Sequence, residues 1–132
     1  MGGIAGLVDF NGTPELGVVQ AMGRALAHRG RDGEGHFTEG PVALAHRLKR
    51  VSDSRTQQPL VTPDLVVVMD GWIYDHEAVA KRAGHAQGDL TDVQVLAAAF
   101  RAWGTSLVRH LDGAFAAAIW HRQQKRLFLV RD

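Results

Sequence analysis

The sequence contains no cysteine, and this absence excludes disulfide bonds, thiolate metal ligands and a cysteine nucleophile together. It also has no apolar run approaching 18 residues and no basic segment followed by an apolar one. Neither a membrane-spanning helix nor a signal peptide is therefore predicted. We expect a cytoplasmic protein that has no membrane as a partner.

An excess of charge of one sign is also missing, because 15 basic and 14 acidic residues give a net charge of +1. This balance does not indicate nucleic acid as a partner. Seven histidines are present, but none are spaced as a metal-binding pair on one helix, so we expect no metal site. With 45% hydrophobic residues over 132 positions, the chain is long enough to form one domain with a buried core.

The first ten residues combine an apolar run with bounding glycines and a turn at Asn11-Gly12, which predicts a buried strand. A buried strand at this place is unusual, because chain ends normally fray at the surface. We infer that the first residues are held in the core for a purpose.

Helical spacing and end signals predict helices that begin at Thr13-Pro14-Glu15, over His76–Ala83 and over Asp92–Trp103. The last of these is preceded by a capping box, Thr91 to Gln94. A loop is expected from Arg31 to Gly35 and an exposed one across Ser52–Gln58. Strands are predicted at His36–Thr38, Pro41–Arg47, Leu65–Met69, Ala114–His121 and Arg126–Val130, with the third buried on both faces. Strands in hairpins with helices between some of them favour an α+β fold with antiparallel sheets.

Seven motifs follow the opening Met1–Gly6 in a fixed order. They are His28-Arg29-Gly30-Arg31-Asp32-Gly33, Leu44-Ala45-His46-Arg47, Gln58-Pro59-Leu60, Asp70-Gly71-Trp72-Ile73-Tyr74-Asp75, Thr91-Asp92-Val93-Gln94-Val95-Leu96, Leu111–Trp120 and Leu127–Asp132. Together they resemble the class II glutamine amidotransferase domain, an N-terminal nucleophile hydrolase domain best known from asparagine synthetases. The resemblance implies that residues 1–132 form one glutaminase-like domain, an αββα sandwich of two stacked antiparallel sheets. Because the family's domain continues into further strands, we expect this domain to be truncated at its C-terminus, as a fragment, a split subunit or a short form.

The catalytic positions depart from the family. Its nucleophile is a cysteine that follows the initiator Met, and Gly2 stands there without a thiol. Its oxyanion hole is formed by an Asn-Gly pair, and here Asp70 precedes Gly71. An ionised carboxylate has no proton to donate. Losing one oxyanion donor typically slows catalysis about a hundredfold to a thousandfold.

The substrate-binding positions depart as well. Trp72 replaces a glutamate beside the pocket, and Leu48 replaces the arginine that pairs with the substrate carboxylate. Arg47 is then the candidate substrate-binding cation, although neighbours on a strand face opposite sides. Asp92 alone matches, at the position that holds the substrate ammonium. Plainer interpretations remain open: Asp70 as a turn residue, Trp72 as strand packing, and Asp92 as an acid favoured at a helix N-terminus.

Because the departures cluster in one pocket, they favour a degenerate domain that does not hydrolyse glutamine. The expected role is a scaffold for an asparagine-synthetase-like, ATP-dependent ligase that forms an amide, lactam or macrolactam, as β-lactam synthetases and lasso-peptide cyclases do. ATP and Mg²⁺ are expected on the synthetase domain or partner chain and no cofactor on this chain, which has no Ser-x-Gly-x-Asp-Ser motif. Two alternatives stay open: an active domain that supplies ammonia from glutamine for asparagine synthesis, and a non-catalytic module that binds a peptide or amino acid.

The strand Arg126–Val130 carries a further expectation. If no strand pairs beyond it, it leaves a free sheet edge that can pair with another chain. We therefore expect a homo-oligomer or a partner chain.

Overall fold

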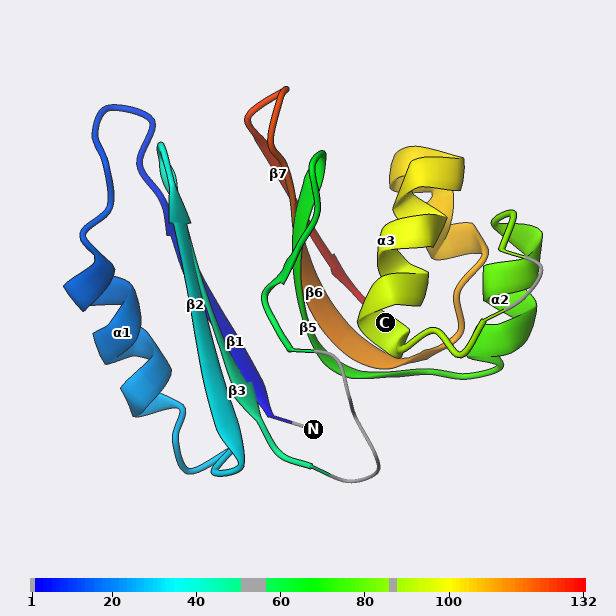
Figure 1. Ribbon diagram of the computed structural model, residues 1–132, viewed down its shortest axis with the longest axis horizontal. Helices are drawn as coiled ribbons and strands as arrows, with labels where there is room; N and C mark the ends of the chain where they lie inside the picture. The colour runs from blue at the N-terminus through cyan, green and yellow to red at the C-terminus, as the bar shows by residue number, and fades with distance from the viewer. Residues whose placement is uncertain (1, 51–56, 86–87) are drawn as a thin grey trace.

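The computed structural model describes residues 2–50, 57–85 and 88–132, and within these ranges two antiparallel sheets lie face to face (Figure 1). The first sheet has the order β1-β3-β2, formed by β1 (Gly3–Val8), β2 (Gly33–Glu39) and β3 (Val42–Leu48). The second has the order β4-β5-β6-β7, formed by β4 (Leu60–Val61), β5 (Leu65–Ile73), β6 (Gly113–His121) and β7 (Arg126–Arg131).

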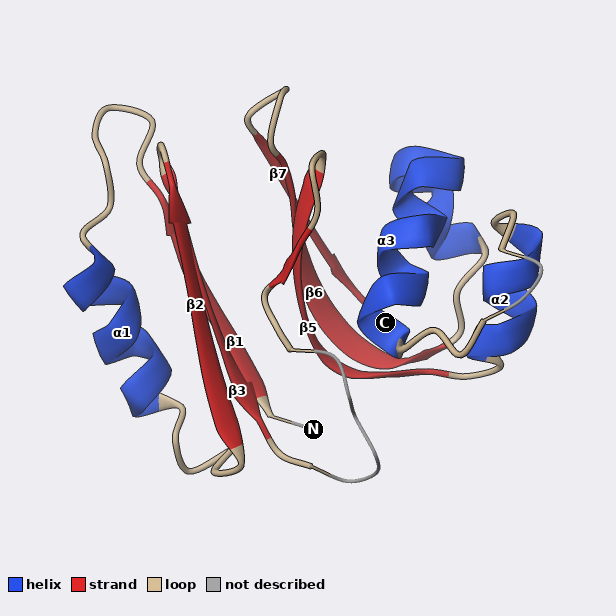
Figure 2. Ribbon diagram, in the orientation of Figure 1, coloured by secondary structure: helices blue, strands red, loops and turns tan. Residues whose placement is uncertain are grey.

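Helices cover the outer face of each sheet (Figure 2). Helix α1 (Leu16–Ala25) packs on the first sheet, and α3 (Asp92–Trp103) packs on the second. Helix α2 (His76–Arg82) and the 3₁₀ helix η1 (Gly104–Arg109) lie beside α3. The layers run helix, sheet, sheet, helix, and the predicted α+β class with two stacked antiparallel sheets is confirmed.

Alternation along the strands separates the core into layers. In β5, Val66 and Val68 face the first sheet and pack against its Leu44 on β3, together with Trp120 of the neighbouring strand β6. Residues of the opposite parity, such as Val67, face α3 instead. The run Leu65–Met69 is buried throughout, as its unbroken apolar sequence predicts.

Helix α3 confirms the capping-box prediction, because its bounds are the predicted ones and the backbone N–H of Thr91 donates to Gln94 Oε1 at 2.9 Å. This start fixes Asp92 in the first turn of the helix, next to the end of β5. No helix among the described residues is long and apolar enough to span a membrane.

The first strand is correctly placed, but the expectation that it is buried is wrong. Among the described strands, β1 is the edge strand of its sheet and pairs with β3 alone. Its outer position leaves Leu7 36% exposed, and Phe10, just beyond it, is 69% exposed. Gly2 and Gly3, however, are buried.

Among the further differences from the expectations are two boundaries and one additional strand. Helix α1 begins at Leu16 because Glu15 takes the cap position with extended backbone, without a side-chain cap from Thr13. Strand β2 already begins at Gly33, where pairing with Leu48 extends the ladder through part of the expected loop. The short strand β4 was not predicted. Most of the expected loop Ser52–Gln58 lies outside the described residues, as does Met1.

Candidate functional site

The catalytic positions inferred from the sequence meet at one end of the two sheets. Gly2 directly precedes β1, whose first residue, Gly3, pairs with Arg47 near the end of β3. Asp70 lies in β5 of the opposite sheet and reaches Gly2 across the space between the layers. Two segments 68 residues apart are thereby joined.

Gly2 has no space for a side chain. A Cβ atom built on it would lie 1.8 Å from the carbonyl oxygen of Arg47 and 3.2 Å from the backbone nitrogen of Lys49. The first distance is far below any real contact, and both atoms belong to the backbone. With this backbone, position 2 accepts only glycine.

Asp70 is engaged by two donors. The backbone N–H of Gly2 donates to Asp70 Oδ1, and Arg29 Nη2 lies 3.2 Å from Asp70 Oδ2. Arg29 Nε also donates to the carbonyl oxygen of Gly2 at 2.7 Å. The Asp70 side chain is 14% exposed and that of Arg29 is 49% exposed. At this position the chain therefore presents an acceptor, where the resemblance implies a donor to an oxyanion.

Gly71 follows with a φ of 118°, a conformation that side-chain-bearing residues rarely adopt. A Cβ on it would lie 2.0 Å from the carbonyl oxygen of Ala114 on β6. Gly71 still pairs with Phe115, so β5 continues past this point to Ile73.

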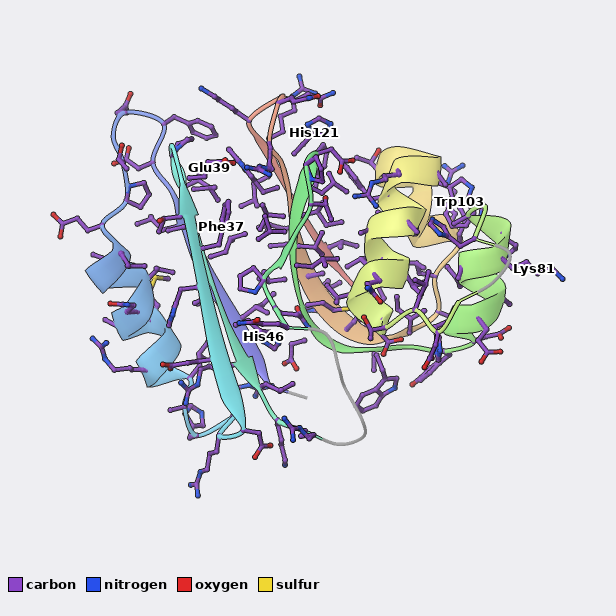
Figure 3. All side chains as sticks on the ribbon, in the orientation of Figure 1. Phe37, Glu39, His46, Lys81, Trp103 and His121 are labelled. Carbon is purple, nitrogen blue, oxygen red and sulfur yellow. The ribbon has the colours of Figure 1, made fainter. Side chains whose placement is uncertain are left out.

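His46 is a buried residue of this region that the sequence analysis did not single out. It is 5% exposed and shares the β3 face of Val42 and Leu44, toward the second sheet (Figure 3). Burial lowers the pKa of His46 to about 4, while the charge of Asp70 and the backbone of Met69 act in the opposite direction. The ring is therefore neutral at physiological pH. In the sequence, the burial of His46 was indicated only by its position in the motif Leu44-Ala45-His46-Arg47, within a strand of apolar residues.

Arg47 points away from this group. Its Nε donates to the carbonyl oxygen of Gly30 at 3.0 Å and its guanidinium pairs with Glu34. It has the parity of Ala45, which packs toward α1. Leu48 has the parity of His46, so β3 offers an apolar side chain toward the second sheet where the resemblance implies an arginine.

Asp92 forms a separate arrangement with the end of β5. Its Oδ1 is buried without a hydrogen-bond partner in the described structure and lies 3.7 Å from His76 Nδ1. Burial raises the pKa of Asp92, whereas His76 and the backbone of Ile73 lower it. Ile73 is three residues from Asp70, about 10 Å along a strand. Asp92 is thus a neighbour of the Asp70 group and not a member of it.

Trp72 and Tyr74 flank Ile73 and remain partly open to solvent, with 38% and 49% exposure. Among the described residues, no hydrogen bond or ion pair joins Trp72 to Asp92. Within the same ranges, no three His, Asp or Glu side chains form a group suited to a metal ion.

Comparison with known proteins bears on these residues. A family model described as a glutamine amidotransferase domain matches residues 1–132. The asparagine synthetase [glutamine-hydrolyzing] 1 of Arabidopsis thaliana is 33% identical over 118 residues, which cover 86% of this chain and 20% of that protein. The asparagine synthetase [glutamine-hydrolyzing] 2 of Bacillus subtilis (strain 168) is 29% identical over 140 residues, which cover 100% of this chain and 19% of that protein.

A relative with a different name also matches. The amidase chyE of Penicillium rubens is 31% identical over 113 residues, which cover 81% of this chain and 17% of that protein. The chain spans about a fifth of the length of the curated relatives it matches.

Proposed function

This chain belongs to the glutamine amidotransferase domain family, among the domains related to asparagine synthetases, and we propose that it does not hydrolyse glutamine. One observation carries the proposal: position 2 has no thiol and no space for a Cβ atom against the Arg47 carbonyl. A reaction that needs a cysteine side chain at this position lacks the sulfur atom, and the backbone leaves no space for the side chain that would carry it.

The charge at Asp70 supports the same proposal. In the amide hydrolysis implied by the resemblance, negative charge develops on the substrate oxygen, and a hydrogen-bond donor must stabilise it. Asp70 presents a carboxylate that already accepts from Gly2 and pairs with Arg29. A second negative charge beside it would be repelled, and the absent donor alone typically costs about a hundredfold to a thousandfold in rate.

We further propose that the domain is a scaffold within an ATP-dependent amide ligase. The match to asparagine synthetases and the fifth of their length that the chain spans support a larger assembly. If an amine of the substrate itself attacks the activated carboxylate, no ammonia is required, and a glutaminase site has no task. ATP and Mg²⁺ would bind the synthetase part, because this sequence has no Ser-x-Gly-x-Asp-Ser loop.

The experiment that tests the proposal is a restoration series, with glutamate release from glutamine as the measurement. Gly2→Cys, with the preceding Met removed, should show no activity above background, because the Cβ clash and Asp70 remain. A matched control is Gly17→Cys, since a Cβ at Gly17 meets nothing within 4 Å and the variant carries a thiol outside the site. Strong activity from Gly2→Cys alone would overturn the proposal.

A second series extends the first. Asp70→Asn, Leu48→Arg and Trp72→Glu, added together to Gly2→Cys, restore the residues that the resemblance implies. We expect this combination to recover some activity, provided that β3 can shift away from position 2. If the combined variant folds and stays as inactive as Gly17→Cys, the backbone around Gly2 is the dominant obstacle.

A second candidate function is a non-catalytic binding module, which is favoured by Asp92 Oδ1, because this atom has no hydrogen-bond partner among the described residues and has only His76 Nδ1 nearby, at 3.7 Å. A buried carboxylate oxygen without a donor suits an ammonium group. Calorimetric titration with glutamine and with alaninamide, which has an amine but no carboxylate, tests it. Binding that Asp92→Asn abolishes would support this candidate, and no binding of either probe would reject it.

A further inference from the structure

Arg29, Gly2 and Asp70 come from three separate parts of the fold. Arg29 lies in the loop after α1, Gly2 precedes β1 in the first sheet, and Asp70 belongs to β5 in the second sheet. Their contacts form a closed cycle. The backbone N–H of Gly2 donates to Asp70, Arg29 Nε donates to the carbonyl oxygen of Gly2, and Arg29 Nη2 pairs with Asp70. We propose that these three residues form a clamp that holds the two sheets together at this end. The proposal does not depend on whether glutamine is hydrolysed.

The cycle differs from an ordinary surface ion pair. Exposed pairs stabilise little because two long side chains lose freedom for one contact. Here a single ordered Arg29 side chain makes two contacts, one to a carboxylate and one to a backbone carbonyl. Asp70 is mostly shielded from solvent, and Gly2 uses both of its backbone polar groups. Loss of Arg29 would leave the Asp70 carboxylate and the Gly2 carbonyl without this donor.

The lack of a side chain at Gly2 is part of the clamp. In the position where both backbone groups of Gly2 make these contacts, a Cβ built on Gly2 would lie 1.8 Å from the Arg47 carbonyl oxygen. A Cβ would force Gly2 away and would break the two contacts at once. Glycine at position 2 is thereby required for the clamp, independently of the lost nucleophile.

The opposite end of the sheets offers a matched comparison. There Arg122 pairs with Glu39 of β2, with Nη2 2.7 Å from Glu39 Oε1, and its Nη1 donates to Thr62 O at 2.7 Å. Figure 3 shows Glu39 near the upper end of the first sheet and His46 farther down, between the sheets. Arg122–Glu39 is therefore also an arginine–carboxylate contact between sheets, but it does not bind the start of β1.

A double-mutant cycle on the full chain measures the coupling within the clamp. Arg29→Met and Asp70→Asn should each raise the unfolding equilibrium constant about tenfold, because each removes a charge-assisted contact. The double variant should be at least about fivefold less destabilised than the product of the two effects, since both remove the same interaction. The control cycle, Arg122→Met with Glu39→Gln, removes a contact made through both Nε and Nη2 of Arg122, so it should also show coupling, but it should leave amide exchange over residues 3–8 unchanged.

Amide hydrogen exchange then distinguishes a clamp from general stabilisation. Arg29→Met should raise exchange over residues 3–8 about tenfold, while β7 exchange rises much less. Arg29→Lys keeps the charge near Asp70 and loses the Nε contact to Gly2, so its effect should be intermediate. If Arg29→Met does not fold, the lysine variant carries the same comparison. Coupling below about twofold, or an equal rise of exchange over both sheets, would overturn the proposal.

Discussion

Replacing Gly2 by alanine adds one methyl group at a point where the backbone has no space for it. The new Cβ would lie 1.8 Å from the Arg47 carbonyl oxygen, so either β3 or Gly2 must move. The end of β3 is held by pairing with both neighbouring strands and by a bond from Asp32 N to Leu48 O at 2.9 Å. Moving Gly2 is the smaller change, and it breaks the contacts to Asp70 and Arg29.

Hydrogen bonds to charged groups contribute about 1.5 kcal/mol or more each, so two of them amount to about 3 kcal/mol. Alanine offsets about 1 kcal/mol of this by restricting the unfolded chain. We expect Gly2→Ala to lower the free energy of unfolding by about 2 kcal/mol, measured by urea denaturation. The control Gly17→Ala lies in α1 with open space around its Cβ, and should raise stability by about 0.5–1 kcal/mol. A Gly2→Ala variant within about 0.5 kcal/mol of the wild type would refute the reasoning.

Three further predictions concern other parts of the molecule. The pKa of His46 is about 4 in the folded protein and 6.5 in the unfolded chain. As the pH falls from 6.5 to 4, the unfolded chain therefore binds a proton at His46 before the folded protein does. The free energy of unfolding should fall over this range by up to about 3 kcal/mol. His46→Gln should flatten this part of the stability profile; an unchanged profile would contradict the assignment. Arg101 and Asp64 form a half-exposed ion pair at 2.8 Å, so Arg101→Met should lower the free energy of unfolding by no more than about 1 kcal/mol, and by less in high salt. A larger loss of stability in denaturant titrations would contradict this. β7 is the outer strand of the described second sheet and Leu129 is 76% exposed, so Leu129→Lys should reduce self-association measured by light scattering; a chain that is already monomeric at high concentration would contradict the expected oligomer.

Much of the fold could be predicted because local signals agreed with the tertiary structure. Helix α3 begins directly after the N-cap of its capping box, Thr91, and its bounds, Asp92–Trp103, are the predicted ones. The Leu65–Met69 run predicts burial on both faces, and it lies between the opposite sheet and α3. The burial of β1 was misjudged because an apolar sequence does not say whether a strand has one neighbour or two.

The site was only partly accessible from the sequence. Motif resemblance identified positions 2 and 70 as departures, and strand alternation predicted that Arg47 and Leu48 lie on opposite faces. The absence of space at Gly2 depends on the approach of the Arg47 carbonyl across a strand pair, which no local pattern reports. The role of Arg29 depends likewise on contacts 27 and 41 residues away.

The most direct test of the account is glutamate release by the purified chain incubated with glutamine. The account predicts no release above a glutamine-only control, because position 2 has neither a thiol nor space for one and Asp70 cannot donate to an oxyanion. Turnover within a few tenfold of an ordinary glutamine amidotransferase domain would contradict it.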